Sequence, residues 1–272
     1  MATDLARIIA DAYRWQRRLG HTQIAGSNCH IVADPAHPDV WDSNHVDEVT
    51  AQTDTEIDAV FAAMDEHLGH TASRVIHTDC FTPDAFLARL ALDDFEERPV
   101  TIQMALRGDL TDRGRPITLR PVASDADGMR CSSSSSPITP KVLRTKGLDM
   151  PPEVSAGMVA GYRAKSGAYH FHLAIENGLP VAYGAHAAAP NGAGMIEDLF
   201  TLQSARRRGI AMAMIAAFAD RLQAAGCHTI FLGALATERP KHLYARLGFH
   251  PVTLARAWVR ELSSTSRKPA ER

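Results

Sequence analysis

A twelve-residue segment determines the fold expected for this chain: Leu202-Gln203-Ser204-Ala205-Arg206-Arg207-Arg208-Gly209-Ile210-Ala211-Met212-Ala213. It follows a strand-like run at 195–201 and leads into a stretch with apolar residues at helical spacing, so we expect a helix to begin near Gly209. A helix start exposes backbone N–H groups without internal partners, and the peptide dipoles favour an anion there. Small residues at 209 and 211 beside three arginines therefore predict a phosphate-binding loop. The alternative is an ordinary basic loop that caps a surface helix.

The composition is that of a globular protein with room for a sizeable core. Of 272 residues, 45% are hydrophobic and 22% are charged. The sequence has no apolar run long enough to span a membrane and no basic N-terminal region followed by a hydrophobic stretch, so we expect a cytoplasmic protein without a membrane partner. The four cysteines lie far apart and form no C-x-x-C pair, which argues against a zinc site or a disulfide framework.

The charge is divided unevenly along the chain. Residues 1–112 contain 20 acidic residues and 8 arginines, whereas residues 113–272 contain 11 acidic and 21 basic residues. A basic half suits a polyanionic cofactor, and the acidic half either attracts a cationic substrate or complements the basic half. The basic residues are scattered and few aromatic residues lie between them, so we expect no nucleic-acid partner.

The polar stretch 107–116, which contains two glycines and ends in proline, is typical of a linker. It predicts a first domain at 1–112, a second at 113–262 and a disordered polar tail at 263–272. In the second domain, apolar patterns and turn signals predict these elements in order: a strand at 117–122, helices, a hairpin at 168–176 and 179–188, a strand at 195–201, a helix at 208–225, a strand at 229–232, a helix at 239–246, and strands at 249–254 and 256–261.

This order of elements resembles the GNAT superfamily of acyl-CoA-dependent N-acyltransferases. The segment Ile196-Glu197-Asp198-Leu199-Phe200-Thr201 followed by Arg206 to Ala211 fits the family's strand and its [Q/R]-x-x-G-x-[G/A] loop, and Leu243-Tyr244-Ala245-Arg246-Leu247-Gly248-Phe249 fits its L-Y-x-x-x-G-F segment. The resemblance covers about residues 115–262. It implies an α+β fold, in which a mixed, mostly antiparallel sheet is flanked by helices, and acetyl-CoA as co-substrate.

The resemblance also implies where the co-substrate binds. In relatives, the strand that corresponds to Leu199, Phe200 and Thr201 separates from the next strand, and its backbone binds the pantetheine arm in the V-shaped slot. The main-chain N–H groups of residues 206–212 correspond to those that hold the diphosphate. Thr237 stands where many relatives have asparagine; its hydroxyl can bond the pantetheine but lacks the paired donor and acceptor of an amide.

Two residues match catalytic positions of the family. Tyr244 is the expected general acid for the departing thiolate, with a purely packing tyrosine as the alternative. Glu197 is the expected base for the acceptor amine, with a solvated carboxylate as the alternative. Asp198 points to the opposite face if the strand is regular, which makes it the weaker candidate. Backbone N–H groups near Phe200 or Thr201 would supply an oxyanion site.

Three histidines lie on the predicted hairpin, namely His170, His172 and His186. They have no cysteine or carboxylate at a spacing that would complete a ligand set, so we expect no metal. Histidines on a strand face more often lie at the surface or line a pocket, and an acceptor pocket is one such place.

The acidic half follows a similar order of strands and helices. At the position of the phosphate loop, however, residues 51–56 have no glycine and contain two acids. We therefore expect residues 1–112 to be a degenerate GNAT-like domain without a CoA site, so that the chain has two tandem units. The alternative is an unrelated small α/β domain.

The reaction that the resemblance implies is direct transfer of an acetyl group from acetyl-CoA to a primary amine of a small molecule. A cationic acceptor would suit the acidic half. A non-catalytic acyl-CoA-sensing module and a protein or peptide N-acyltransferase are the alternatives. The oligomeric state stays open, with a homodimer as one option.

Overall fold

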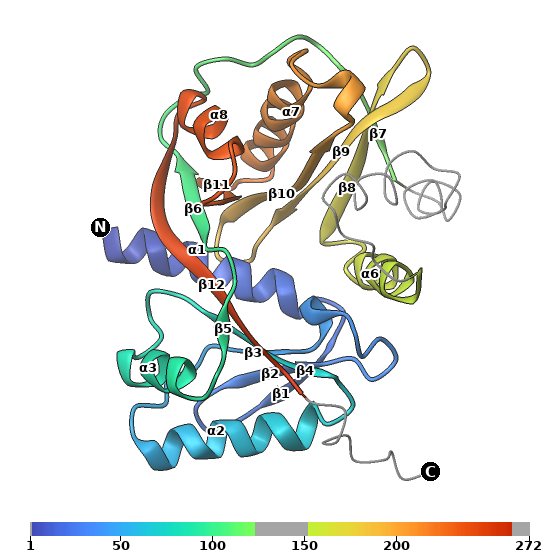
Figure 1. Cartoon of the computed structure of the whole chain (residues 1–272). Coiled ribbons are helices and arrows are strands. Elements are labelled where there is room, and N and C mark those ends of the chain that lie inside the picture. Colours follow the sequence, from blue (N-terminus) through green and yellow to red (C-terminus); the bar gives the residue numbers. More distant parts are fainter. Residues whose placement is uncertain (1, 123–151, 263–272) are drawn as a thin grey trace. The chain divides into compact units, whose positions relative to one another are not determined.

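The computed structural model describes residues 2–122 and 152–262, which form two compact units (Figure 1). The predicted tail at 263–272 lies outside the described residues. The units consist of the following ranges: Met1–Ile102, Leu235–Glu238 and Thr253–Arg272 for unit 1, and Gln103–Ala234 and Arg239–Val252 for unit 2. Among the described helices, we find none that is both long and apolar enough to cross a membrane.

Unit 1 has a mixed sheet with helices on both faces. Its elements are α1 (Ala2–Arg18), β1 (Thr22–Ala25), β2 (His30–Ala33), the 3-10 helix η1 (Trp41–Ser43), β3 (His45–Asp47), α2 (Asp54–His67), β4 (Ser73–Thr78), α3 (Asp84–Leu92), β5 (Glu96–Glu97) and the start of β6 (Thr101–Leu106). Strands β1, β2 and β3 are antiparallel, and β4 joins β3 in parallel. The helix α1 was not among the predicted elements, although it is amphipathic and buries Ala6, Ile9, Ala10 and Ala12.

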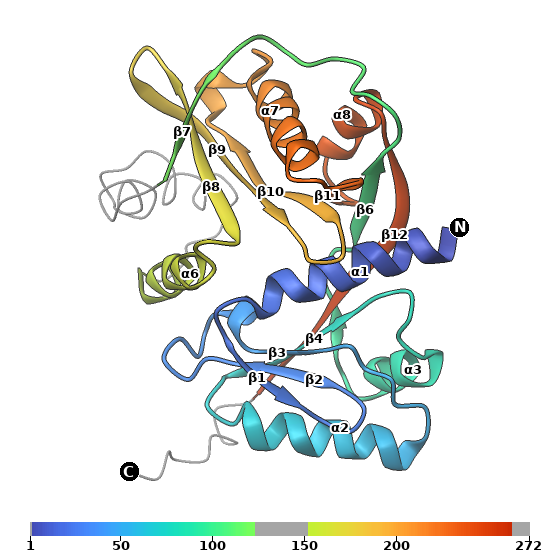
Figure 2. The ribbon, with the colours of Figure 1, turned by 180° about the vertical axis from the view of Figure 1, so that it is seen from behind.

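The core of unit 1 lies between α2, α3 and one face of the sheet. Ile57 and Met64 of α2 and Phe86 of α3 are fully buried against Ile31 and Ile76 of the strands. Figures 1 and 2 show α1 on the opposite side of these strands from α2. Burying this apolar face against the helices is the main contribution to the stability of the unit.

Ion pairs attach α1 to the strand ends of unit 1. Arg18 Nη2 lies 2.5 Å from Asp47 Oδ1 and 2.6 Å from Glu48 Oε2, and Arg14 Nη2 lies 2.6 Å from Asp79 Oδ2. Burial alone would raise the pKa of Asp47, but hydrogen bonds and charges from His45 and Arg18 outweigh it and hold the pKa at about 2. Asp47 therefore stays ionised in the folded protein.

Unit 2 contains the larger sheet. Its elements are β7 (Thr118–Pro121), α6 (Pro152–Ala164), β8 (Tyr169–Glu176), β9 (Leu179–Ala188), β10 (Ala193–Thr201), the 3-10 helix η2 (Gln203–Ala205), α7 (Ile210–Ala224), β11 (Thr229–Leu235), α8 (Pro240–Arg246) and the start of β12 (Phe249–Glu261). The strand order is β12-β6-β11-β10-β9-β8-β7. Strands β7 to β10 pair antiparallel, and β10 pairs with β11 in parallel. The predicted mixed, mostly antiparallel sheet flanked by helices is confirmed.

Helix α7 packs closely on the sheet of unit 2. A Cβ atom on Gly194 would lie 3.0 Å from Leu222 of the helix, and one on Gly184 would lie 3.0 Å from Phe218. Figure 1 shows α7 over β9 and β10, and α6 at the start of β8. Glycines in two neighbouring strands therefore let the helix approach the backbone.

The last strand of each half of the chain takes part in both units. Residues 249–252 of β12 belong to unit 2, whereas the rest of β12 belongs to unit 1 and pairs antiparallel with β4 from Arg256 to Glu261. Conversely, β6 begins in unit 1 and continues in unit 2 from Gln103. The units therefore differ from the predicted ranges 1–112 and 113–262. The strands predicted at 249–254 and 256–261 are one continuous strand, β12, which runs from Phe249 to Glu261.

Strand β12, which takes part in both units, gives a first prediction. Removing residues 253–272 would leave β4 without the partner that pairs with all six of its residues, so we expect unit 1 to lose its cooperative unfolding transition. Circular dichroism melts and amide hydrogen exchange would detect this. Removal of 263–272 alone is the control and should leave the melt unchanged. If a chain lacking 253–272 melts like the full chain, the pairing of β12 with β4 does not stabilise unit 1.

The depressed pKa of Asp47 gives a second prediction. Because the folded pKa of about 2 lies below the usual value of 3.8 for an aspartate, this carboxylate stabilises the fold above pH 4, and the contribution is lost as the pH falls towards 2. Asp47→Asn should lower the free energy of unfolding by about 2 kcal/mol at pH 7 and by progressively less on acidification. Urea unfolding at several pH values measures this. Asp220→Asn, which removes an exposed partner of Arg113, should have little effect.

Candidate active site

The strands β10 and β11 separate after a short paired region. Their parallel register covers Ala193–Ile196 of β10 against Thr229–Leu232 of β11, whereas β10 continues to Thr201. Hydrogen-bonded strands lie about 4.8 Å apart, so a strand that continues without a partner on one side presents its backbone groups there. Residues 197–201 thus have the geometry that a V-shaped cofactor slot requires.

A β-bulge interrupts β10 at the start of this open region. Glu197 pairs with Ala185 and Phe200 with Tyr183, so Asp198 and Leu199 both lie opposite Gly184. Asp198 has a φ of 53°, in the left-handed region. A Cβ atom on Gly184 would lie only 2.8 Å from Leu199 Cδ2, so the glycine makes room for the bulge.

The bulge changes the environment of the two carboxylates. Asp198 accepts hydrogen bonds from Tyr169 Oη at 2.6 Å and from Tyr162 Oη at 3.1 Å. Burial raises the pKa of Tyr169 well above its usual value, and the charges of Asp198 and Glu197 raise it further. The charges of both carboxylates therefore raise the pKa of the same phenol, that of Tyr169. The expectation that Asp198 faces away assumed a regular strand and is corrected here. Sequence reasoning did not select Tyr162 or Tyr169.

Main-chain groups of the strand after the bulge point alternately to its two sides. Leu202 donates its N–H to Val181 O at 2.9 Å, so the main-chain groups of Leu202 and of Phe200, two residues before it, face β9. The main-chain N–H and C=O of the intervening Thr201 therefore face the open side. The Thr201 carbonyl accepts from Arg206 Nε at 3.0 Å. The Phe200 side chain packs with Tyr183, with 5.4 Å between ring centroids. Of residues 199–201, Phe200 is therefore bonded and packed towards β9.

The loop after β10 leads directly into the start of α7. Gly209 caps the helix with a φ of 78° and provides no side-chain cap. Among the described residues, none accepts a hydrogen bond from the N–H groups of Gly209, Ile210, Ala211 or Met212. The start of a helix of 15 residues is therefore open to an anion, as the sequence predicts.

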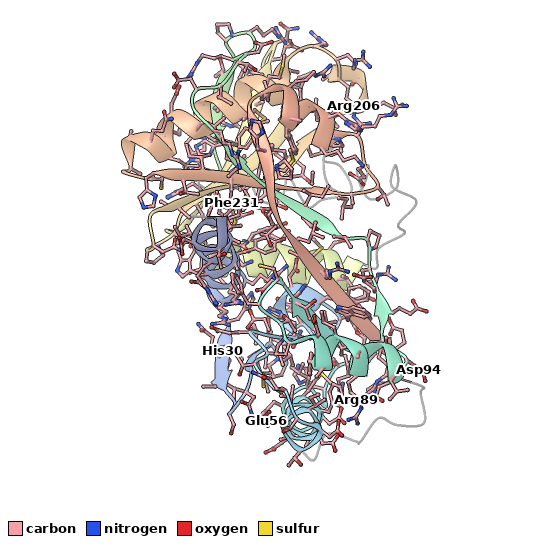
Figure 3. All side chains as sticks on the ribbon, turned by 90° about the vertical axis from the view of Figure 1, so that its left-hand side faces the viewer. His30, Glu56, Arg89, Asp94, Arg206 and Phe231 are labelled. Atoms are coloured by element: carbon pink, nitrogen blue, oxygen red, sulfur yellow. The ribbon has the colours of Figure 1, made fainter. Side chains whose placement is uncertain are left out.

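The three arginines of this loop differ in how they are held. Arg206 bonds to the Thr201 carbonyl and lies at the outer edge of the loop in Figure 3. Arg208 Nη2 lies 2.8 Å from Glu176 Oε2, and Arg115 also bonds to Glu176. Arg207 has a φ of 64° and makes no ion pair with a described carboxylate. Two of the three predicted phosphate-binding side chains are thus held by other residues, and Arg207 is the most adaptable.

The remaining predicted site residues lie on separate elements. Tyr244 is on α8, is 7% exposed, and its ring centroid lies 6.4 Å from that of Phe249. Glu197 directly precedes the bulge in β10 and is half-buried. Thr237 is exposed in the turn after β11, and this turn belongs to unit 1, where Ala236 donates its N–H to Val100 O at 2.8 Å. Thr237 is therefore not among the residues that unit 2 brings together.

The histidines of the hairpin pack on the face of the sheet that carries α7. The rings of His172 and His186 lie 5.5 Å and 5.0 Å from that of Phe218. Arg221 Nη1 lies 2.5 Å from His172 Nε2; since arginine only donates, this nitrogen accepts and the ring is neutral. Burial lowers the pKa of His172 to about 4 and that of His186 to about 3.

Tyr169 and His170 are neighbours in β8, so their side chains lie on opposite faces. The histidine face therefore differs from the face of Tyr169. No group of histidine, cysteine and carboxylate side chains that could hold a metal ion occurs in the described parts of the chain.

Helix α2 of unit 1 starts in a different way. The carboxylate of Glu56 accepts hydrogen bonds from the N–H groups of Gln52 at 2.8 Å and Thr53 at 2.9 Å, and Thr53 Oγ1 accepts from the N–H of Glu56. These bonds lower the pKa of Glu56. A carboxylate of the chain itself thus occupies the place that an anion takes at an open helix start.

Comparison with known proteins points to one family. Residues 145–249 match the model of the acetyltransferase (GNAT) family. A search of curated proteins found no match. Three similar solved structures are a functionally unknown conserved protein from Staphylococcus epidermidis ATCC 12228, a GCN5-related N-acetyltransferase from Kribbella flavida and a tandem GNAT protein from the clavulanic acid biosynthesis pathway.

These structures cover most of the chain at low identity. The Staphylococcus protein is 14% identical, with a TM-score of 0.66 and 89% of this chain and 95% of that chain covered. The Kribbella protein is 18% identical, with a TM-score of 0.62 and coverage of 93% and 95%. The tandem GNAT protein is 12% identical, with a TM-score of 0.58 and coverage of 91% and 82%. Such likeness shows the fold, and the model of the acetyltransferase (GNAT) family matches residues 145–249 of unit 2.

Proposed function

We propose that this chain is an N-acetyltransferase that transfers an acetyl group from acetyl-CoA to a primary amine of a small molecule. The observation that carries the proposal is the parting of β10 from β11 next to the open start of α7, within the segment that matches the GNAT family. A slot with unpaired backbone suits the amide-rich pantetheine arm, and a helix start suits its diphosphate.

The donor would bind through main-chain groups. In this proposal, Leu199 and Thr201 bond the pantetheine from the open side of β10, and the N–H groups of residues 209–212 hold the diphosphate. Arg207 adds positive charge that no described carboxylate neutralises. The four N–H groups are directional, whereas the arginine contributes mainly through charge.

The acceptor would attack from the side of the carboxylates. The amine nitrogen forms a bond to the acetyl carbonyl carbon, its surplus proton passes to Glu197 directly or through water, and the C–S bond breaks. The departing thiolate takes a proton from the hydroxyl of Tyr244. Asp198, held by Tyr162 and Tyr169, places a second negative charge beside Glu197, which favours an acceptor that carries positive charge.

Unit 1 supports a tandem arrangement with one active site. Its β3 ends at Asp47, and the next residue, Glu48, has a φ of 53°, the same as that of Asp198 in the pair Glu197-Asp198. In unit 1, however, Arg18 binds both acids. Because Glu56 also closes the start of α2, we propose that unit 1 is a GNAT-like copy that binds no CoA.

The test of the proposal is release of free thiol from acetyl-CoA in the presence of a panel of amines, with mass spectrometry of the products. We expect Tyr244→Phe to lower kcat by about 100-fold or more with little change in the KM for acetyl-CoA, because proton transfer contributes about that factor. Arg113→Gln, which removes an exposed ion pair with Asp220 of α7, is the control. If calorimetry shows acetyl-CoA binding but no amine is acetylated, the chain is a sensing module; acetylation of peptides alone would indicate a peptide acyltransferase.

The difference between the loop arginines gives a further prediction. Arg207→Gln should raise the KM for acetyl-CoA about 3- to 10-fold and make it less dependent on salt, because a charge that contacts phosphate is lost. Arg113→Gln removes the same charge from an exposed position and should change the KM by less than twofold. Equal effects of both substitutions would mean that Arg207 acts only through the net charge of the unit.

A further inference from the structure

Unit 1 contains a cavity of about 250 Å³ that takes no part in the proposed reaction. All its lining residues belong to unit 1 and come from α1, η1, β4, the segment between β5 and β6, the end of β11 and β12. The polar lining residues are Tyr13, Arg17, Asp42, His77, Arg98, Thr101 and Arg256. The cavity thus has three guanidinium groups and one carboxylate on its walls, and two of the three arginines come from the acidic half of the chain, residues 1–112.

The three arginines are not equally engaged. Arg256 forms an ion pair with Glu97, and Arg98 Nη1 lies 3.9 Å from Glu96 Oε2. Arg17 makes no ion pair with a described carboxylate; its guanidinium lies 4.0 Å from the centroid of the Tyr13 ring. Stacking on an aromatic face holds a guanidinium in place while its N–H groups stay available at the edge. Arg17 is therefore the cation best placed to bind a ligand in the cavity.

His77 adds a buried polar group to the same cavity. It is 8% exposed, and neither ring nitrogen has a hydrogen bond of normal geometry, although the main chain of Arg256 lies close by. The ring of His45 packs edge-on against it, with 4.8 Å between centroids. Burial lowers the pKa of His77 well below its usual value, and the charge of Arg17 lowers it further. A neutral imidazole has one N–H donor, and leaving it without a partner away from water costs about 1 to 3 kcal/mol.

We propose that this cavity binds a small organic oxyanion, a carboxylate or a phosphate group, through Arg17 and the imidazole of His77. The guanidinium supplies charge and paired N–H donors, and the imidazole supplies the N–H that lacks a partner. The volume lies just below the range of about 300 to 1,000 Å³ for ligand pockets, which fits a metabolite of few atoms and excludes a whole CoA molecule. Unit 1 is thereby a ligand-binding domain in its own right.

The experiment titrates the full chain with inorganic phosphate and, separately, with acetate at constant ionic strength. Saturating CoA is present so that the start of α7 in unit 2 is occupied. Calorimetry measures the affinity, and NMR of the histidine ring signals reports on His77. We expect saturable binding of at least one anion, a shift of the His77 signals, and at least fivefold weaker binding in Arg17→Gln. The anion that binds more tightly separates a phosphate from a carboxylate ligand.

Two further variants complete the test. Arg113→Gln removes the same charge from unit 2 and should bind the anion as the unchanged chain does. Arg98→Gln should also weaken binding, and it does not replace a buried side chain as His77→Gln would. Melting curves establish that each variant is folded. Absence of saturable binding by either anion would overturn the proposal. So would equal weakening by Arg17→Gln and Arg113→Gln, or binding that leaves the His77 signals unmoved.

Discussion

The short parallel pairing of β10 with β11 is the constraint on which the site of unit 2 depends. Four residues of each strand are paired, and β10 then continues with backbone groups on one side that the sheet does not satisfy. Buried backbone groups without partners are costly, so such an edge persists only where water or a ligand reaches it. The same strand runs through the bulge at Asp198 and ends just before the loop that starts α7. One interruption of the sheet thus places an open backbone edge, two carboxylates and an open helix start along a single stretch of about 15 residues.

In unit 1, side chains occupy the groups that a similar arrangement of strand and helix start leaves open in unit 2. Its β3 ends at Asp47, the left-handed Glu48 follows, and α2 begins six residues after Glu48. Here Arg18 neutralises the acids, and Glu56 satisfies the N–H groups at the start of α2. Both replacements are intramolecular and cost no binding entropy, so a diphosphate would have to displace a carboxylate that is already in place. Backbone geometry alone therefore does not make a site; the residues at positions 18 and 56 decide whether it is open.

Local patterns predicted most elements of unit 2 and the open start of α7. Asn177-Gly178 predicts the hairpin, and Gly209 before an apolar helix predicts the loop, because both depend on conformations that glycine adopts easily. Three features were out of reach. The bulge at Asp198 depends on space beside Gly184, a contact between strands that no local pattern encodes. The hydrogen bonds of Tyr162 and Tyr169 to Asp198 follow from that bulge. The path of β12 depends on which sheet edge it joins, and a strand's sequence does not specify its partner.

The strands shared between the units give a physical reason why the first half of the chain is kept, even if it binds no CoA as we propose. In unit 2, β11 lies between β10 and β6, and β6 comes from the end of the first half of the chain. Because β11 leaves β10 after Leu232, its later residues rely on the other edge for backbone partners. Without β6, β11 would be an edge strand along much of its length. No strand on its other side would then hold β11 in the position in which it is separated from β10. Losing the first half would thus disturb the geometry of the donor site even though none of its residues contacts the donor in the proposed mechanism.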